Sequence, residues 1–461
     1  MIDRLVLFGA TGDLTGRLLL PGLARLLETG RLPDGFTILG AAQEGLDDEA
    51  FRRSAAEALD RHADDVPSGV RDALAQSLRY RQVDIEDADS MRGALGAARE
   101  PVAVYLALPP GLFAPTVRTL AGIGLPEGSR VALEKPFGED LDGAVELNRL
   151  LERVPGLAGE RAVFRVDHFL GMTTVQNLLG IRLANRILEP VWNSTHIERV
   201  EIVWEETLAL EGRAGYYDRA GQLKDMIQNH LLQIVCLIAM EPPAGLGERD
   251  LRDRKLDVLR SVRPLTARDA EVLTRRARYT AGRIADRAVP AYADEDGVDA
   301  ERRTETFAEV TFHLDGWRWD GTPFHIRTAK AMARDRMEVV ICFREVPRLP
   351  FGDRAAPAPN ELRIGLQIEQ ERDVELHVTG IAPEADSGLV PLTLTAELPR
   401  SELREYSRVL LDLLDGDSAL SIRGDEAEAA WRIVTPILEA WEQDRVPLEE
   451  YPAGSEGPPA R

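Results

Sequence analysis

Three glycines near the start of the chain constrain its fold more than any other feature. Gly9, Gly12 and Gly16 follow a short apolar run at 4–8 (RLVLF) and precede an apolar stretch with a helical pattern, LLLPGLARLLETG. Glycine in such a turn lets the backbone approach a pyrophosphate, and the following helix supplies N–H donors and a positive dipole. The spacing therefore predicts a strand, a dinucleotide-binding loop and a helix, although an ordinary tight turn is the plain alternative.

The alternation of strands and helices continues beyond this loop. Apolar runs typical of buried strands lie at 36–42, 101–110 and 129–138. A helical pattern covers 47–80. Strands that alternate with helices need crossover connections, which place the strands parallel in one sheet. We therefore expect an α/β first domain, Rossmann-like and doubly wound, that binds a dinucleotide over residues 1–175.

The pattern changes after about residue 180. Longer segments with alternating polar and apolar residues appear, among them IERVEIVWEETL, TETFAEVTFHL, RMEVVICFRE and DVELHVTG. This alternation is typical of a half-solvated antiparallel sheet. With the helical segments between them, these strands predict a larger α+β domain with a mainly antiparallel sheet over residues 176–461. The Gly- and Pro-rich tail YPAGSEGPPAR is expected to be loosely held.

Composition excludes several classes of protein. Acidic residues exceed basic ones by 78 to 56, a formal charge of −22 that disfavours nucleic-acid binding. No stretch approaches the roughly 18 to 20 apolar residues of a membrane span, and the first apolar run is too short for a signal peptide. The two cysteines, Cys236 and Cys342, lie in apolar runs far apart, so we expect neither a disulfide framework nor a metal site. These observations predict a soluble, cytoplasmic globular protein.

The residues after the second predicted strand bear on the choice of cofactor. An acid at this place binds the ribose hydroxyls of NAD, whereas an arginine receives the 2′-phosphate of NADP. Gln43 and Glu44 follow the strand here, and no basic residue occurs until Arg52. The sequence therefore favours NAD, unless an arginine from a loop folds back.

Two of the seven histidines lie among polar residues. His168 directly follows Asp167, and His230 lies five residues after Asp225 within LKDMIQNHLLQ. Histidine is the usual general base near neutral pH, and a carboxylate fixes its tautomer and stabilises its charged form. Either histidine is a candidate base for removing a hydroxyl proton during alcohol oxidation. The alternative is a structural role for both.

Several motifs occur together in a fixed order along the chain. They are GATGDLTGRLLLPGL, YLALPPGLF, EKPFG, RVDHFLGM, EGRAGYYDRAGQLKDMIQNHLLQ, HIRTAK and PAGSEGP. Together they resemble the glucose-6-phosphate dehydrogenase family along essentially the whole chain. The resemblance implies oxidation of C1 of β-D-glucose 6-phosphate to the 1,5-lactone, NADP as the usual cofactor, and a place in the pentose phosphate pathway. It also implies a homodimer or homotetramer formed through the large antiparallel sheet.

The resemblance implies a role for each candidate residue. His230 would be the general base for the C1 hydroxyl, and Asp167 would hydrogen-bond its imidazole. His168 would contact the substrate phosphate, and Lys135 would stand between sugar and nicotinamide, ahead of a proline that the family holds cis. The residues implied to bind the sugar hydroxyls are Glu206, Asp225 and Lys330. The residues implied to line the cofactor are Gly9, Thr11, Gly12, Asp13, Leu14, Gln43, Tyr105 and Lys135.

The lysine count supports two of these roles. Only four of the 56 basic residues are lysine, so most basic positions have accepted arginine. Lys135 and Lys330 are two of the four, and both lie at positions where the resemblance implies an active-site lysine. A compact ammonium is evidently required there, because a planar guanidinium differs from it in shape and hydrogen bonding.

Four departures from the family remove basic side chains. Met172 and Leu18 stand where the family carries lysines that reach the substrate, and Gly16 replaces a further lysine. Gln43 replaces the arginine that recognises the 2′-phosphate. Each charge-assisted contact to phosphate contributes about 1.5–3 kcal/mol, so losing two weakens phosphate binding by about two to four powers of ten.

These losses leave three interpretations open. In the first, Arg17 or Arg182 supplies the missing positive charge, and the substrate is unchanged. In the second, the enzyme acts with NAD on a hexose that is unphosphorylated or differently substituted at C6. In the third, the protein is a non-catalytic binding or regulatory paralog, although the retained Asp167, His168 and His230 argue against it.

Overall fold

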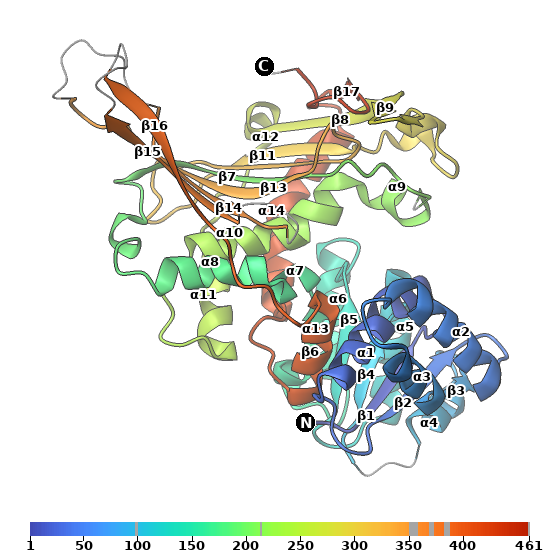
Figure 1. Ribbon diagram of the computed structural model, residues 1–461. Helices are drawn as coiled ribbons and strands as arrows, with labels where there is room; N and C mark the ends of the chain where they lie inside the picture. Colours follow the sequence, from blue (N-terminus) through green and yellow to red (C-terminus); the bar gives the residue numbers. More distant parts are fainter. Residues whose placement is uncertain (97–99, 213, 350–357, 368–372, 382–387, 460–461) are drawn as a thin grey trace. The chain divides into compact units, whose positions relative to one another are not determined.

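The computed structural model describes the chain apart from residues 97–99, 213, 350–357, 368–372, 382–387 and 460–461. The described residues form two compact units, each with its own sheet (Figure 1). The first unit consists of Met1–Thr173, Pro243–Asp253 and Ser401–Glu428. The second consists of Thr174–Pro242, Arg254–Arg400 and Ala429–Arg461. Each unit is described by itself below.

The first unit contains a six-stranded parallel sheet with the order β3-β2-β1-β4-β5-β6. Its strands are β1 (Arg4–Phe8), β2 (Thr37–Ala42), β3 (Arg79–Gln82), β4 (Ala103–Leu106), β5 (Arg130–Glu134) and β6 (Val163–Val166). The order reverses between β1 and β4, and ligands of such sheets bind beyond the carboxyl ends of the strands at this point. The sheet confirms the expected doubly wound, Rossmann-like architecture.

Helices connect the strands of the first unit. They are the π-helical η1 (Thr15–Leu19), α1 (Leu20–Glu28), α2 (Asp48–His62), α3 (Ser68–Ser77), α4 (Ala88–Leu95), α5 (Phe113–Ile123), α6 (Leu141–Glu152), α7 (His168–Gly171) and α13 (Glu405–Asp415). Short 3-10 turns occur as η2 (Pro110–Leu112) and η3 (Gly159–Ala162). Helix α13 comes from late in the chain, yet Leu410 and Leu414 belong to the same buried core as Leu5 and Leu19.

The helical expectation for residues 47–80 is wrong in part. Helix α2 begins after Asp47, whose carboxylate accepts from Ala50 N at 2.8 Å, and ends at His62. Pro67 precedes α3, which ends at Ser77. The following residues form β3, which pairs in parallel with β2 at the edge of the sheet. Its partner lies about 40 residues earlier, so the periodicity of the segment itself carried no sign of the pairing.

The second unit contains a nine-stranded mixed sheet with the order β16-β15-β14-β13-β7-β12-β11-β8-β17. Its strands are β7 (Ile197–Glu205), β8 (Thr274–Thr280), β11 (Phe307–Phe312), β12 (Phe324–Ala329), β13 (Arg336–Phe343), β14 (Glu361–Gly365), β15 (Val374–Ile381), β16 (Leu389–Ala396) and β17 (Leu448–Pro452). Only the pairs β7–β12 and β8–β17 are parallel among these strands. The expected mainly antiparallel sheet is therefore confirmed.

Helices and short elements complete the second unit. They are α8 (Thr173–Leu183), η4 (Glu189–Val191), α9 (Ala214–Gln222), the π-helical η5 (Leu223–Leu231), α10 (Leu232–Ala239), α12 (Ala267–Leu273), β9 (Gly282–Ile284), β10 (Arg287–Val289), η6 (Tyr292–Asp294) and η7 (Ala300–Arg302). Two more helices, α11 (Glu248–Ser261) and α14 (Gly424–Glu442), begin in residues of the first unit and end in residues of the second. Within the described residues, no helix has the length and apolar character needed to span a bilayer.

The C-terminal tail is not loosely held as expected. Residues 448–452 form β17 at the edge of the nine-stranded sheet, and Tyr451 is fully buried. The Tyr451 hydroxyl donates to the carbonyl of Lys330 at 2.7 Å. Ser455 O accepts from Ala333 N at 2.9 Å. A buried tyrosine and backbone pairing thus hold a segment whose Gly- and Pro-rich composition is typical of a flexible terminus. Its last two residues lie outside the described part of the chain.

Candidate active site

The glycine loop follows β1 and has the geometry of a phosphate cradle. Gly9 has a φ of +80°, and a Cβ there would lie 2.1 Å from the carbonyl oxygen of Ala107, so only glycine fits. Gly12 N donates to Gly9 O at 3.0 Å, which closes the turn. Thr11, Gly12 and Asp13 are exposed in the loop, and Leu14 is half-buried.

The helix after this loop begins as the π-helix η1. Thr15 Oγ1 donates to Gly9 O at 3.1 Å, which ties the first turn to the end of β1. The Asp13 carboxylate pairs with Arg17 at 3.3 Å. π-Helical turns are rare and occur often at functional sites. The predicted cofactor-binding residues of the loop therefore lie together, at the carboxyl end of β1.

The residues that follow β2 face the same loop. Glu44 Oε2 accepts from Thr11 Oγ1 at 2.9 Å, and the Glu44 carbonyl accepts from the Tyr80 hydroxyl at 2.6 Å. Gln43 is exposed, and its carbonyl accepts from Gln82 Nε2 at 2.8 Å. The structure thus brings the acid after the second strand into direct contact with the predicted nucleotide loop.

The nearest arginines along the chain point elsewhere. Arg52 donates to the carbonyl of Leu78 at 2.9 Å and lies 3.7 Å from Asp48. Arg79 pairs with the same carboxylate at 3.1 Å. Backbone and arginine contacts hold the pKa of Asp48 below its usual value, so it stays ionised and keeps both guanidinium groups. Neither arginine folds back over Gln43 in this structure.

The EKPFG motif forms the turn after β5. The Lys135–Pro136 peptide bond is cis, as the resemblance implied, and Lys135 is half-buried. The residue before it, Glu134, is 9 % exposed. The Tyr105 hydroxyl donates to Glu134 Oε1 at 2.5 Å. Tyr105 is fully buried in the core of the first unit, and its place beside the cofactor stays a prediction.

Asp167 and His168 lie where β6 passes into α7. The Asp167 carboxylate caps α7 by accepting from Phe169 N at 3.0 Å, and its side chain is buried. His168 is half-buried, and its ring stacks on that of Tyr406 from α13, with centroids 5.5 Å apart and planes 20° apart. The cap and the stack give both side chains a fixed direction at the carboxyl end of the sheet.

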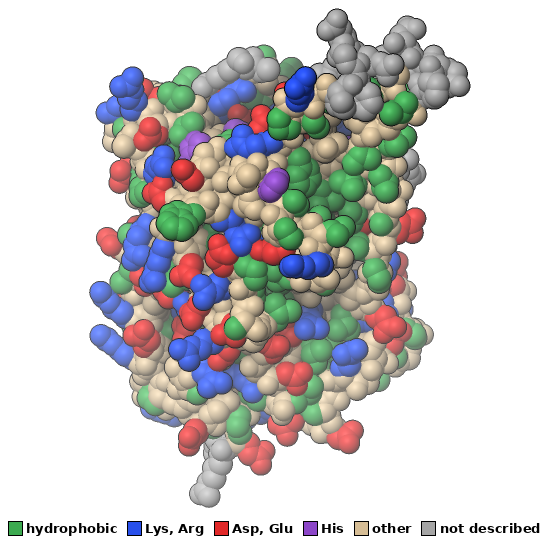
Figure 2. Space-filling model, turned by 90° about the vertical axis from the view of Figure 1, so that its left-hand side faces the viewer, with side chains coloured by type: hydrophobic (Ala, Val, Ile, Leu, Met, Phe, Trp, Pro, Cys, Tyr) green, Lys and Arg blue, Asp and Glu red, His purple; other side chains and the backbone are tan. Residues whose placement is uncertain are grey.

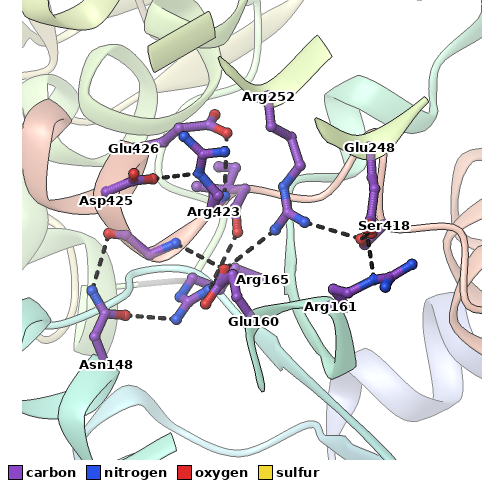
Figure 3. Close-up of polar contacts among 12 residues, drawn as sticks. Asn148, Glu160, Arg161, Arg165, Glu248, Arg252, Ser418, Arg423, Asp425 and Glu426 are labelled. Atoms are coloured by element: carbon purple, nitrogen blue, oxygen red, sulfur yellow. Dashed lines mark hydrogen bonds and ion pairs between the residues drawn. The ribbon is translucent and has the colours of Figure 1, made fainter. Parts of the chain in front are cut away.

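A buried polar network anchors the strand that carries these two residues (Figure 3). Arg165 is 1 % exposed and bonds Glu160 and Asn148, each at 2.6 Å. Its carbonyl accepts from Ile422 N at 3.0 Å, which covers the edge of β6. Arg252 bonds the same Glu160 carboxylate at 3.2 Å. Three distant segments of the chain therefore hold β6 two residues before Asp167.

The second unit places Asp225 and His230 on one π-helical segment. Both lie within η5 and are buried, at 6 % and 1 % exposed. A π-helix bonds residue i to residue i+5, so these two residues lie one turn apart on the same face. The Tyr216 hydroxyl lies 3.5 Å from Asp225 Oδ1. An α-helix would rotate residues five apart away from each other, so the π-helical form sets their relation.

Glu206 and Lys330 meet at the ends of two neighbouring strands of the second unit. β7 and β12 are parallel, and Glu205 lies opposite Ala329, so the next residue of each follows side by side. Lys330 Nζ lies 2.8 Å from Glu206 Oε2 and 5.4 Å from the centre of the Tyr217 ring. Ala329, directly before Lys330, occupies a regular buried strand position.

Two positions where the resemblance implies a lost lysine, Leu18 and Met172, differ in exposure. Leu18 is 40 % exposed and Met172 is 9 % exposed. The guanidinium of Arg182 is buried and bonds Glu189 at 3.1 Å and the carbonyl of Ile238 at 3.0 Å, which makes it the weaker candidate for compensation. Arg17 has 57 % of its side chain exposed and carries only an exposed pair with Asp13, so it is the better candidate.

The predicted residues therefore separate by unit. The first unit holds Gly9, Thr11, Gly12, Asp13, Leu14, Gln43, Tyr105, Lys135, Asp167 and His168. The second holds Glu206, Asp225, His230 and Lys330. The Asp167–His230 hydrogen bond stays a prediction. The sequence analysis assigned no role to Glu134 or Tyr406, which contact Tyr105 and His168 respectively. The EKPFG motif contained the first, and nothing near residue 406 pointed to the second.

Comparison with known proteins covers the whole chain. Residues 6–177 match the family model described as "Glucose-6-phosphate dehydrogenase, NAD binding domain", and residues 179–461 match "Glucose-6-phosphate dehydrogenase, C-terminal domain". Glucose-6-phosphate 1-dehydrogenase of Mycolicibacterium smegmatis is 40% identical over 98% of this chain and 94% of its own length. The enzyme of the same name from Gluconobacter oxydans is 41% identical, with the same coverage.

Solved structures agree with these matches. The glucose-6-phosphate 1-dehydrogenase of Mycobacterium avium superposes with a TM-score of 0.86 at 32% identity, covering 99% of this chain and 96% of the other. A glucose-6-phosphate dehydrogenase in complex with its substrate superposes with a TM-score of 0.87 at 30% identity and the same coverage. The similarity includes both units and leaves no large segment of either chain without a counterpart.

Proposed function

Because this chain belongs to the glucose-6-phosphate dehydrogenase family, we propose that it oxidises C1 of β-D-glucose 6-phosphate to the 1,5-lactone with a nicotinamide dinucleotide. The observation that carries the proposal is full-length similarity at about 40% identity to enzymes of that name. The groups that the chemistry needs are present, namely His230, Asp167, Lys135 and Lys330.

The first unit fits a dinucleotide. A Cβ at Gly9 would collide with the backbone of Ala107, and the exposed residues Thr11 to Asp13 leave loop N–H groups within reach of a pyrophosphate. Gly9, Thr11, Gly12, Asp13 and Leu14 would hold it, with Lys135 beside the nicotinamide. When bound, the oxidised nicotinamide supplies the acceptor for the hydride.

In the proposed reaction His230 acts as the general base. Its imidazole takes the proton of the C1 hydroxyl while the C1–H bond breaks and its electron pair leaves as hydride, so that the C1–O bond becomes a carbonyl. Asp167 stabilises the imidazolium that forms, as carboxylates do in other carboxylate–histidine pairs. His230 later returns the proton to solvent.

The other retained groups orient the sugar. Lys330 and Glu206, paired at 2.8 Å, offer a donor and an acceptor to neighbouring hydroxyls, and Asp225 offers a second acceptor one π-turn before the base. His168 would receive the phosphate. Correct placement of C1 against base and nicotinamide lowers the barrier, because the reacting atoms no longer need to be brought together during the step.

We further propose that the enzyme accepts NAD. The Glu44 carboxylate beside Thr11 supports this proposal, because an acid there binds the ribose hydroxyls and repels a 2′-phosphate. The exposed Gln43 adds no positive charge, and Arg52 and Arg79 are held by Asp48. NADP as main cofactor would require Arg17 or another basic group to move.

A kinetic matrix tests these proposals together. Glucose 6-phosphate, glucose and a C6-methylated glucose are each assayed with NAD and with NADP. We expect turnover of glucose 6-phosphate with NAD at least as efficient as with NADP. A strong preference for unphosphorylated glucose would favour the changed-substrate interpretation, which Leu18 and Met172 motivate. Binding of cofactor without turnover of any sugar would favour a regulatory paralog.

We also propose that the chain self-associates through an end of the nine-stranded sheet, as a dimer or a dimer of dimers. β16 is an edge strand of that sheet, and Leu392 and Leu394 on it are 48 % and 55 % exposed. Figure 2 shows a face of the molecule on which hydrophobic side chains gather. An apolar edge strand pairs readily with a second copy. A monomeric mass in light scattering of the wild type would contradict this proposal.

The cytoplasm is the proposed location. Cys236 and Cys342 are both buried and are not joined in a disulfide within the described residues, as expected for a chain that keeps its thiols reduced. Burial raises the pKa of the Cys342 thiol to about 12, so this thiol stays protonated and unreactive. Fractionation of the native cell with an antibody against the chain tests the location.

A further inference from the structure

A carboxyl group without an assigned role lies at the end of β5, directly before Lys135. Glu134 is 9 % exposed and accepts a hydrogen bond of 2.5 Å from Tyr105, a residue of β4. The Tyr406 hydroxyl, from α13, interacts with the same carboxyl group and lowers its pKa. Two phenols from distant parts of the chain thus close over one buried acid within the first unit.

This acid is linked to the predicted phosphate ligand by one side chain. The Tyr406 ring stacks on the His168 ring with centroids 5.5 Å apart. A phenol whose hydroxyl is held by Glu134 has a fixed ring plane, and the imidazole packed on that plane is fixed with it. Without the carboxyl group, the hydroxyl would be buried unsatisfied or would turn away, at a cost comparable to a lost hydrogen bond.

We propose that Glu134 is a positioning residue that orients His168 through Tyr406, and that loss of its proton weakens binding of the phosphorylated sugar. The inference rests on the proposed function, because it takes His168 as the ligand of the substrate phosphate. Glu134 itself touches neither sugar nor cofactor in this proposal. It changes substrate affinity in two ways: through the Tyr406 ring that packs on His168, and through its own negative charge.

The surroundings of Glu134 explain when it carries a charge. Burial raises the pKa of its carboxyl group to about 7, against the opposing effects of the Tyr105 and Tyr406 hydrogen bonds and the Lys135 ammonium, while Asp167 raises it further. These groups come from β4, α13, the turn after β5 and the start of α7. Burial also raises the pKa of both phenols far above neutrality, so the proton that moves is that of Glu134.

The two charge states differ in hydrogen bonding and in field. A protonated carboxyl group donates one bond and accepts others, whereas an ionised one only accepts. Below about pH 7 the group is neutral and the region around His168 carries no added charge from it. Above that pH it becomes negative and opposes a phosphate dianion nearby. Substrate affinity therefore falls as the pH rises through the pKa of Glu134.

Glu134→Gln locks the neutral arrangement, because the amide donates and accepts like a protonated carboxyl group of the same shape. The KM for glucose 6-phosphate is measured from pH 6 to 8.5 with saturating cofactor. We expect wild type and variant to agree at pH 6, and the variant to have an about fivefold lower KM at pH 8.5. Titration of the phosphate affects both proteins equally and cancels in the ratio. Glu139→Gln, an exposed acid five residues later, is the matched control and should follow wild type.

Tyr406→Phe gives a second, independent readout. It removes a hydrogen bond that stabilises the ionised carboxyl group, so the pKa of Glu134 rises and the step in KM moves to higher pH. In the double variant with Glu134→Gln the step should be absent. A step that stays at the same pH in Tyr406→Phe would overturn the link through this tyrosine.

Infrared spectroscopy reads the proton without catalysis. The pH difference spectrum of the wild type should contain a carboxylic-acid band, lost on titration near pH 7, that is missing from Glu134→Gln. Asp412, whose pKa burial also raises to about 7, contributes a band that both proteins keep. An active wild type with an unchanged KM ratio in Glu134→Gln overturns the inference. A wild type without turnover overturns the proposed function, and the infrared test still decides whether Glu134 titrates.

Discussion

Two groups of positions in this enzyme differ in whether they carry a positive charge. Lys330 is retained, buried at 8 % exposure and paired with Glu206 at 2.8 Å. The resemblance implies lysine in the family at the positions of Leu18 and Met172, and neither position carries the arginine that this chain uses in 52 of its 56 basic positions. A general exchange of lysine for arginine would have left charge at both.

In the proposed reaction, the first group acts on the chemical step and the second on substrate binding. In the proposed reaction Lys330 orients the sugar hydroxyls near C1, where a displacement of the ammonium raises the barrier itself. The lost lysines belong to the phosphate end, where a missing contact costs affinity but leaves the reacting atoms in place. Substitutions at the first group should therefore change kcat, and those at the second should change KM.

The largest effect is expected from the base. His230→Asn keeps a polar side chain on η5 and removes the proton acceptor, so kcat should fall by about 10²–10⁴ while the KM for sugar changes little. Steady-state kinetics at pH 7.5 measure both. His313→Asn, a histidine elsewhere in the second unit, is the control. A decrease of less than about tenfold would show that another group takes the proton.

Lys330→Arg tests whether charge alone suffices at the C1 end. The guanidinium is planar and larger than the ammonium that fits between Glu206 and the Tyr217 ring, so kcat should fall by about 10- to 100-fold although the charge is kept. Lys224→Arg makes the same exchange on a half-buried lysine and should change kcat less than twofold. Equal activity of Lys330→Arg and wild type would remove the argument from lysine retention.

Met172→Lys restores charge at the phosphate end. A new charge-assisted contact should lower the KM for glucose 6-phosphate by about tenfold, with kcat and the KM for unphosphorylated glucose unchanged. Leu27→Lys, on an exposed position of α1, controls for the change in net charge. If both variants lower the KM equally, the effect is general attraction and the position at 172 has no special role.

Gln43→Arg has the smallest expected effect, because the position is exposed and solvent screens the new charge. It should raise the ratio of kcat/KM for NADP to that for NAD about fivefold. Glu44→Gln, which removes the acid beside Thr11, should move the ratio in the same direction. Initial rates with each cofactor at saturating sugar measure this ratio. A ratio unchanged in both variants would mean that the cofactor is chosen elsewhere.

Local patterns were sufficient for much of the first unit. The glycine loop and the apolar strands were found where the sequence predicted them, because each depends on a few neighbouring residues. The cis peptide bond before Pro136 agrees with what the family resemblance implied. β3 and the C-terminal strand were missed, since a strand at a sheet edge is stabilised by a partner far along the chain.

The sequence by itself determined which chemical groups this protein has: a nucleotide loop, two candidate histidines and two retained lysines. Only the tertiary structure decided how they act. Parallel pairing of β7 with β12 brings Glu206 to Lys330, and the packing of α13 brings Tyr406 against His168 and Glu134. Hydrogen bonds, burial and the pKa of a carboxyl group depend on neighbours in space, and several of these neighbours lie more than 100 positions away along the chain.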